Sequence, residues 1–245
     1  MEFVVVVAGV LLALWLQEWT QRQRARADMH DADAAIHDEV LGNLEDVMWR
    51  KAVSKCHLER EQLLKSMLLA STDHWPGLQA DALSIRAPVP ETVIPSVYSR
   101  PIEALPTSAW TAALTSGALA PMDHDRFRKL AGIYGQIEVW RRARDDESAA
   151  ISELAALAFP VQLTPDLKAQ MLGAVYRLDR TRFLFAFPST FDIATTMRNI
   201  GWDDRARVDH DIRELYAQIN SAGFVWRKCI QPVENPFRTV PRQAR

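Results

Sequence analysis

Residues 3–16 read FVVVVAGVLLALWL and carry no charged or strongly polar side chain. A helix that spans a bilayer needs roughly 20 apolar residues, so a run of this length also fits a signal-peptide core or a buried helix. The polar sequence QEWTQRQRARAD follows directly, without an Ala-x-Ala cleavage site. The two tryptophans near the end of the run are placed where aromatic rings settle at a membrane–water boundary. We therefore predict a membrane anchor helix over residues 1–19. Its anchoring side chains are expected to include Phe3, Val10, Leu14, Trp15 and Trp19.

After the anchor, hydrophobic residues recur at helical spacing. Steps of four, four and three residues separate Ile36, Val40, Leu44 and Val47. This stripe predicts one long helix that continues to about residue 70. No glycine- or serine-rich linker divides the chain, so residues 20–232 are expected to form a single helical bundle. The predicted fold is all-α, with an N-terminal transmembrane helix that runs into this bundle.

Prolines and capping residues divide the rest of the chain. Trp75-Pro76-Gly77 is expected to end the long helix, because proline cannot continue it. Residues 76–106 are rich in proline and lack a helical period, which predicts a long loop with a short strand around Glu91–Val97. The proline-rich, basic residues 233–245 are expected to form a flexible tail. Further helices are predicted over about 108–116, 123–159, 164–187, 189–201 and 204–229.

The composition is that of a folded protein, and it has no excess of basic residues that would favour binding to polyanions. Of the 245 residues, 48% are hydrophobic and 24% are charged, and the formal net charge is −2. A disordered chain has fewer hydrophobic residues than this. The near-neutral charge produces no global field that attracts nucleic acid, and no basic face is evident. We therefore predict no nucleic-acid partner.

Cys56 and Cys229 are the only cysteines, and each falls on a predicted long helix. Antiparallel packing of these helices would bring the two together, and a bridge between them would persist only in an oxidising compartment. Two reduced, buried cysteines are the alternative.

Arg22, Arg24 and Arg26 follow the anchor and favour a cytoplasmic domain by the positive-inside rule. The rule compares the charges on the two sides of the span, and that comparison fails if further residues precede Met1. The possible disulfide is therefore given more weight, and we predict a single-pass protein of the bacterial inner membrane with a periplasmic domain.

One helical face carries potential metal ligands. His30, Asp33 and His37 lie at positions i, i+3 and i+7, with Asp38 and Glu39 beside them. A second helix would complete a site for zinc or another divalent cation. Exposed polar faces produce such triplets often, so an exposed face without metal is the alternative. We predict no resident cofactor.

Other chemical signatures are missing from the sequence. There is no G-x-S-x-G nucleophile motif and no glycine-rich phosphate loop, so no catalytic residue is predicted. Trp110, in the sequence WTAALTSGALAP, would place an aromatic ring against a ligand or, in the simpler interpretation, belong to the core. Trp140, Trp202 and Trp226 are expected at the core or rim of the bundle.

Two stretches, VVVVAGVLLALWLQEWTQRQ and SAWTAALTSGALAPMDHDRFRKLAGIYGQIE, together cover about a fifth of the chain. They resemble uncharacterised bacterial single-pass proteins of the DUF6090-like kind, a domain of unknown function. The resemblance implies a helical protein with one membrane span and implies no activity.

Three functions are compatible with these patterns. The leading hypothesis is a membrane-tethered, non-enzymatic helical module that binds a partner or ligand. Its expected partners are the lipid bilayer and a membrane protein or a second copy, since Gly9 and Ala13 would allow close helix contact. An extracytoplasmic sensor-like bundle is the second, and a metal-dependent enzyme that uses His30, Asp33 and His37 is the third.

Overall fold

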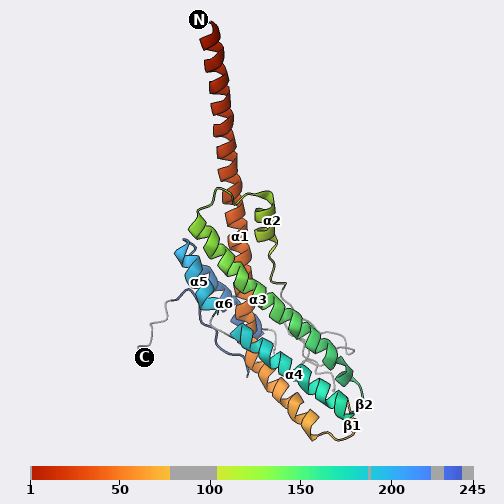
Figure 1. Ribbon diagram of the computed structural model, residues 1–245. Helices are drawn as coiled ribbons and strands as arrows, with labels where there is room; N and C mark the ends of the chain where they lie inside the picture. Colours follow the sequence, from red (N-terminus) through yellow and green to blue (C-terminus); the bar gives the residue numbers. More distant parts are fainter. Residues whose placement is uncertain (1, 78–103, 187–188, 222–228, 239–245) are drawn as a thin grey trace. The chain divides into compact units, whose positions relative to one another are not determined.

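The computed structural model describes residues 2–77, 104–186, 189–221 and 229–238 (Figure 1). The elements in chain order are α1 (Glu2–Ala70), β1 (His74–Trp75), α2 (Ser108–Ser116), α3 (His124–Leu154), the 3-10 helix η2 (Ala155–Ala158), β2 (Val161–Gln162), α4 (Pro165–Ala186), α5 (Ser189–Asn199) and α6 (Arg205–Ser221). The helical fold class is confirmed. The contacts divide the chain into two compact units, one of residues 1–42 and 106–134 and one of residues 43–105 and 135–245.

The predicted membrane anchor is the main correction. Over the described residues, none of the helices has a stretch that is both long and apolar enough to cross a membrane. The physical reason is that Gln17 and Glu18 end the apolar run at Leu16, short of the roughly 20 residues that a span requires. The transmembrane helix over residues 1–19 is therefore wrong, and so is the single-pass inner-membrane location that followed from it.

In the first unit, local capping chemistry fixes the helix ends as the sequence predicts. Gly117 ends α2 with a φ of 74°, in the left-handed region that glycine adopts at least cost. The Asp123 carboxylate then starts α3 by accepting hydrogen bonds from the N–H groups of Asp125 and Arg126 at 2.9 and 3.0 Å. The core of this unit contains Ile36, Val40, Leu41, Ala113, Leu119, Leu130, Ile133 and Tyr134.

In the second unit, the last turns of α1 pack with α3 and α4 (Figure 1). Near the end of α1, Leu63 is 60% exposed while its neighbour Leu64 is buried. Trp140 and Trp202 are buried as expected, and Trp226 lies outside the described residues. The main cluster consists of Leu64, Leu68, Trp75, Ala150, Leu154, Leu157, Leu163, Met171, Ala174, Val175 and Leu178.

A short antiparallel pairing closes one end of this cluster. His74 pairs with Gln162 and Trp75 with Val161, and the Trp75 indole N–H donates to the Leu157 carbonyl at 2.8 Å. Gly77 has a φ of 85°, and a Cβ there would lie 3.1 Å from the Phe159 carbonyl carbon. Glycine is therefore required at the turn after Pro76, which the sequence predicted as a helix stop.

The C-terminal end differs from the prediction. Within the described residues α6 ends at Ser221, and Cys229 lies in a non-helical segment instead of on the helix. We call residues 229–238 the strap. The predicted flexible tail is wrong for the strap's end, because Phe237 is fully buried and Asn235 nearly so. The predicted strand at Glu91–Val97 and most of the 76–106 loop lie outside the described residues.

Candidate functional site

The three predicted metal ligands do not come together. Asp33 instead receives a two-pronged hydrogen bond from the Arg126 guanidinium, with Nε at 3.0 Å from Oδ1 and Nη2 at 2.7 Å from Oδ2. His30 is exposed and His37 is half-buried on the same helix. No cluster of three or more His, Cys, Asp or Glu side chains suited to a metal ion occurs in the described part of the chain. Asp33 thus serves as an ion-pair partner that holds α3 against α1.

Glu39, beside that triplet, caps the N-terminus of α2 from another helix. Its carboxylate accepts hydrogen bonds from the Ser108 hydroxyl at 2.9 Å and the Ala109 N–H at 2.8 Å. It also accepts from the Trp110 N–H at 3.3 Å and the Tyr134 hydroxyl at 2.7 Å. Although burial alone would raise the pKa of Glu39, the donors of Ala109 and Tyr134 together hold that pKa below its usual value. The positive end of α2 is therefore already occupied by a carboxylate of the chain itself.

Trp110 is part of an aromatic stack in the same unit. Its ring lies parallel to Tyr134, with centroids 4.8 Å apart, and tilted against Phe127 at 5.5 Å. Burial, together with the hydrogen bond to Glu39, raises the pKa of Tyr134, so the phenol stays protonated. These contacts favour the interpretation of Trp110 as a packing residue.

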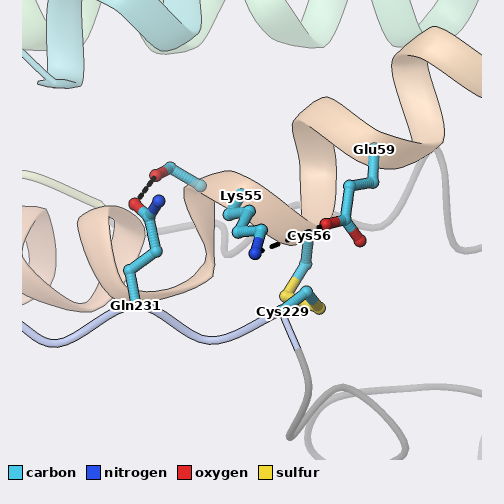
Figure 2. Close-up of a disulfide and its surroundings, with 6 residues drawn as sticks. Lys55, Cys56, Glu59, Cys229 and Gln231 are labelled. Carbon is cyan, nitrogen blue, oxygen red and sulfur yellow. Dashed lines mark hydrogen bonds and ion pairs between the residues drawn. A yellow bond between two sulfur atoms is a disulfide. The ribbon is translucent and has the colours of Figure 1, made fainter.

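A disulfide joins Cys56 on α1 to Cys229 at the start of the strap, across a separation of 173 residues (Figure 2). Beside it, the backbone N–H of Gln231 donates to the Ala52 carbonyl at 2.8 Å, and Ser54 Oγ donates to the Gln231 side chain at 3.2 Å. The predicted pairing of the two cysteines is thus confirmed, although it joins a helix to an extended segment instead of two helices.

The rest of the strap is fixed by contacts with α6. The Tyr216 hydroxyl donates to the Gln231 carbonyl and accepts from the Val233 N–H, both at 2.8 Å. The Asn235 amide donates to the Asp209 carboxylate at 2.8 Å and accepts from the Phe237 N–H at 2.8 Å. The strap therefore ties α6 to α1 through a covalent bond at one end and a polar network at the other.

Buried charged groups lie along one face of α1 in the second unit. The Arg50 guanidinium pairs with the Glu147 carboxylate of α3, and both side chains are at most 6% exposed. The same guanidinium lies 3.8 Å from the centroid of the Phe185 ring. About three turns further along α1, the Glu61 carboxylate lies 3.6 Å from Nε of Arg182. Opposite charges thus meet inside the bundle, where an unpaired charge would be costly.

Two carboxyl groups also meet between α1 and α6. Glu45 is hydrogen-bonded to Asp211, and Nε of Arg207 lies 3.8 Å from Oε1 of Glu45. Burial, followed by the hydrogen bond and the negative charge of Asp211, raises the pKa of Glu45 to about 7. Sequence reasoning missed this pair, because the two residues are 166 positions apart (211 − 45) and neither belongs to a motif.

Among the described residues, most of the exposed large apolar side chains that follow one another along the chain belong to the first turns of α1. We call residues 7–19 the N-terminal apolar segment, which in Figure 1 extends beyond α2. The exposed fractions of its large side chains run from 40% to 61%. They are Val7, Val10, Leu11, Leu12, Leu14, Trp15, Leu16 and Trp19. Four of these belong to the predicted anchor set, and the side chain of Phe3 is outside the described residues.

Comparison of the chain with protein-family models, curated proteins and solved structures finds no match. The resemblance to DUF6090-like proteins accordingly stays a prediction. The candidate site that the geometry leaves is the N-terminal apolar segment, since the other unusual side chains described above have partners within the chain.

Proposed function

We propose that the chain is a non-enzymatic helical module that acts by binding another protein, and that the N-terminal apolar segment is its binding surface. The observation that carries the proposal is the exposure of eight large apolar side chains on consecutive turns of α1. Monomeric proteins rarely expose a contiguous apolar patch of this kind, and such patches mark interaction sites.

The free energy available from covering this segment is of the same order as the cost of forming a complex. Complete burial of a Val, Leu or aromatic side chain contributes about 1.5–3 kcal/mol. Eight side chains that are each about half exposed would therefore contribute roughly 6–12 kcal/mol when covered. Association itself costs on the order of 4–15 kcal/mol, so a stable partner must cover most of the segment and bury apolar surface of its own against it.

The arrangement of these residues restricts the partner. Successive helix positions differ by about 100°, so Val10, Leu11 and Leu12 point in three different directions. A flat surface or a shallow groove contacts one face and leaves the others in water. The partner surface is therefore expected to be one or more apolar helices that pack along the segment.

Site-specific photo-crosslinking in cells tests this proposal. A benzoylphenylalanine residue would replace Leu12 or Trp15 in the full chain, and Gln21 would serve as the matched control because it is exposed on the same helix. Discrete adducts are expected at positions 12 and 15 and absent at 21. Equal labelling at all three positions, or no adduct at any of them, would refute the proposal.

A further inference from the structure

We infer that the partner is another copy of this chain, bound through the same N-terminal apolar segment. This inference rests on the proposed function, because it names the occupant of that binding surface. Three observations support it: the apolar chemistry of the segment, the open space beside Gly9 and the exposed apolar area of the segment.

The first argument is self-complementarity. In a symmetric pair the same surface patch contacts itself, so every group that one copy presents must be tolerated by the other. From Val7 to Leu16 the segment has no charged side chain, and its one side-chain hydrogen-bonding group is the indole N–H of Trp15. Two copies can therefore meet over these residues without like-charge repulsion. Glu18, which follows them, forms an ion pair with Arg22 on the same helix.

The second argument is the space beside Gly9. A Cβ built at this position meets nothing within 4 Å, so the backbone there is open to a neighbour. Ala13 lies one turn further along the same helical face and is also exposed. Small residues on one face let a second helix approach toward the lower end of the usual 8–10 Å spacing between helix axes. The large side chains on either side of this face are then able to interdigitate with those of the other copy.

The third argument is area. If each of the eight large side chains offers about 100 Å² of exposed surface, the segment presents on the order of 800 Å². A stable protein interface buries about 800 Å² on each partner. The segment therefore presents about the area that each partner of a stable interface buries. Because apolar positions surround the helix, one further copy covers a single face, and a third or fourth copy covers the faces that the second leaves open.

Analytical ultracentrifugation of the full-length protein tests the inference. The comparison is between the wild-type chain, the Leu12→Glu/Trp15→Glu variant and the control Gln21→Glu, over protein concentrations spanning three decades. Discrete species of two or more times the 27.8 kDa chain mass are expected for wild type and control. The double variant should associate at least about 100-fold more weakly, since each change removes apolar contact and places a charge in the interface. Because the segment is exposed, the circular dichroism spectrum of the variant should match that of wild type, which shows that the bundle is folded.

The outcomes separate this inference from the function on which it rests. If wild type sediments as a monomer while photo-crosslinks at Leu12 join it to a protein of another mass, the partner is a different protein and the inference is overturned. A broad distribution without discrete species, unchanged in the double variant, overturns it as well. If no position-specific adduct forms, the proposed function fails together with the inference. Adducts of twice the chain mass at Leu12 and Trp15, absent at Gln21, support both.

Discussion

Replacing Glu45 with glutamine should change how the stability of the protein depends on pH. In the folded chain the pKa of the Glu45 carboxyl is raised to about 7 by burial and by the neighbouring Asp211 carboxyl. In the unfolded chain the carboxyl returns to its ordinary value of 4.5. A group with a raised folded pKa binds its proton more tightly in the folded state. Its contribution is fully present below about pH 4.5 and is lost as the pH rises through about 7.

The size of the effect follows from the shift. Each pKa unit corresponds to about 1.4 kcal/mol, so a shift from 4.5 to about 7 sets an upper limit of roughly 3.4 kcal/mol. Glu45 is only half-buried, and the Arg207 guanidinium lowers the cost of its charged form. We therefore expect the wild-type protein to lose about 1–2 kcal/mol of unfolding free energy between pH 5 and pH 8 from this pair. Glutamine keeps a hydrogen-bond donor for Asp211 and does not titrate, so the variant should lose none of it.

Urea unfolding followed by tryptophan fluorescence at pH 5, 6, 7 and 8 measures this difference. The Glu45→Gln variant should match wild type at pH 5 and exceed it by about 1–2 kcal/mol at pH 8. Glu59→Gln is a suitable control, because Glu59 is an exposed carboxylate on the same helix that pairs only loosely with Lys55 at 3.8 Å. Identical pH slopes for wild type and Glu45→Gln, or a less stable variant at pH 8, would show that folding does not raise the pKa of Glu45.

Three further changes test other contacts. Replacing Cys56 and Cys229 together with alanine should lower the unfolding free energy by about 5 kcal/mol, and reductant should lower that of wild type equally in urea titrations. Arg50→Ala, which removes the guanidinium facing Glu147, should cost about 3–5 kcal/mol by thermal and urea unfolding, whereas the apolar pair Arg50→Met/Glu147→Leu should recover most of this loss. Glu39→Ala should lower the unfolding free energy by about 1–2 kcal/mol, because it removes the carboxylate that accepts hydrogen bonds from the first amides of α2. Hydrogen exchange at these amides should become faster, and unchanged exchange there would contradict the capping role.

The helix ends were predictable because their causes are local. Gly117, Asp123 and Thr164 act within three residues of themselves, through a left-handed backbone or a side chain that accepts a nearby N–H. Such signals are complete in the sequence. The start of α4 illustrates this, since the Leu167 N–H donates to the Thr164 hydroxyl at 3.2 Å, where the capping pattern placed it.

The charged contacts were not predictable, because each joins residues far apart in the chain. Arg50 and Glu147 are 97 positions apart and Glu39 and Tyr134 are 95 apart. From spacing alone, a charged residue on a long amphipathic helix is expected on the solvent face. Arg50 lies in the core instead, since a carboxylate from α3 compensates its charge there. The disulfide was one of two alternatives for the two cysteines, argued from antiparallel packing of two predicted helices, and the extended shape of the strap had no sequence signal.

These buried contacts also explain how one helix of 69 residues keeps a single alignment with its neighbours. Asn43, Arg50, His57 and Leu64 follow one another at steps of seven and are all buried, so they occupy equivalent positions of one core stripe. If that stripe were wholly apolar, a shift of α1 by seven residues would replace one hydrophobic contact with another at little cost. With Arg50 in the stripe, the same shift separates the guanidinium from Glu147 and leaves two charges in the core. We infer that the pair contributes to the choice of register more than to stability. The apolar Arg50→Met/Glu147→Leu variant separates the two effects: it should unfold at nearly the wild-type urea concentration but with a shallower transition, and an equally steep transition would argue against a register role.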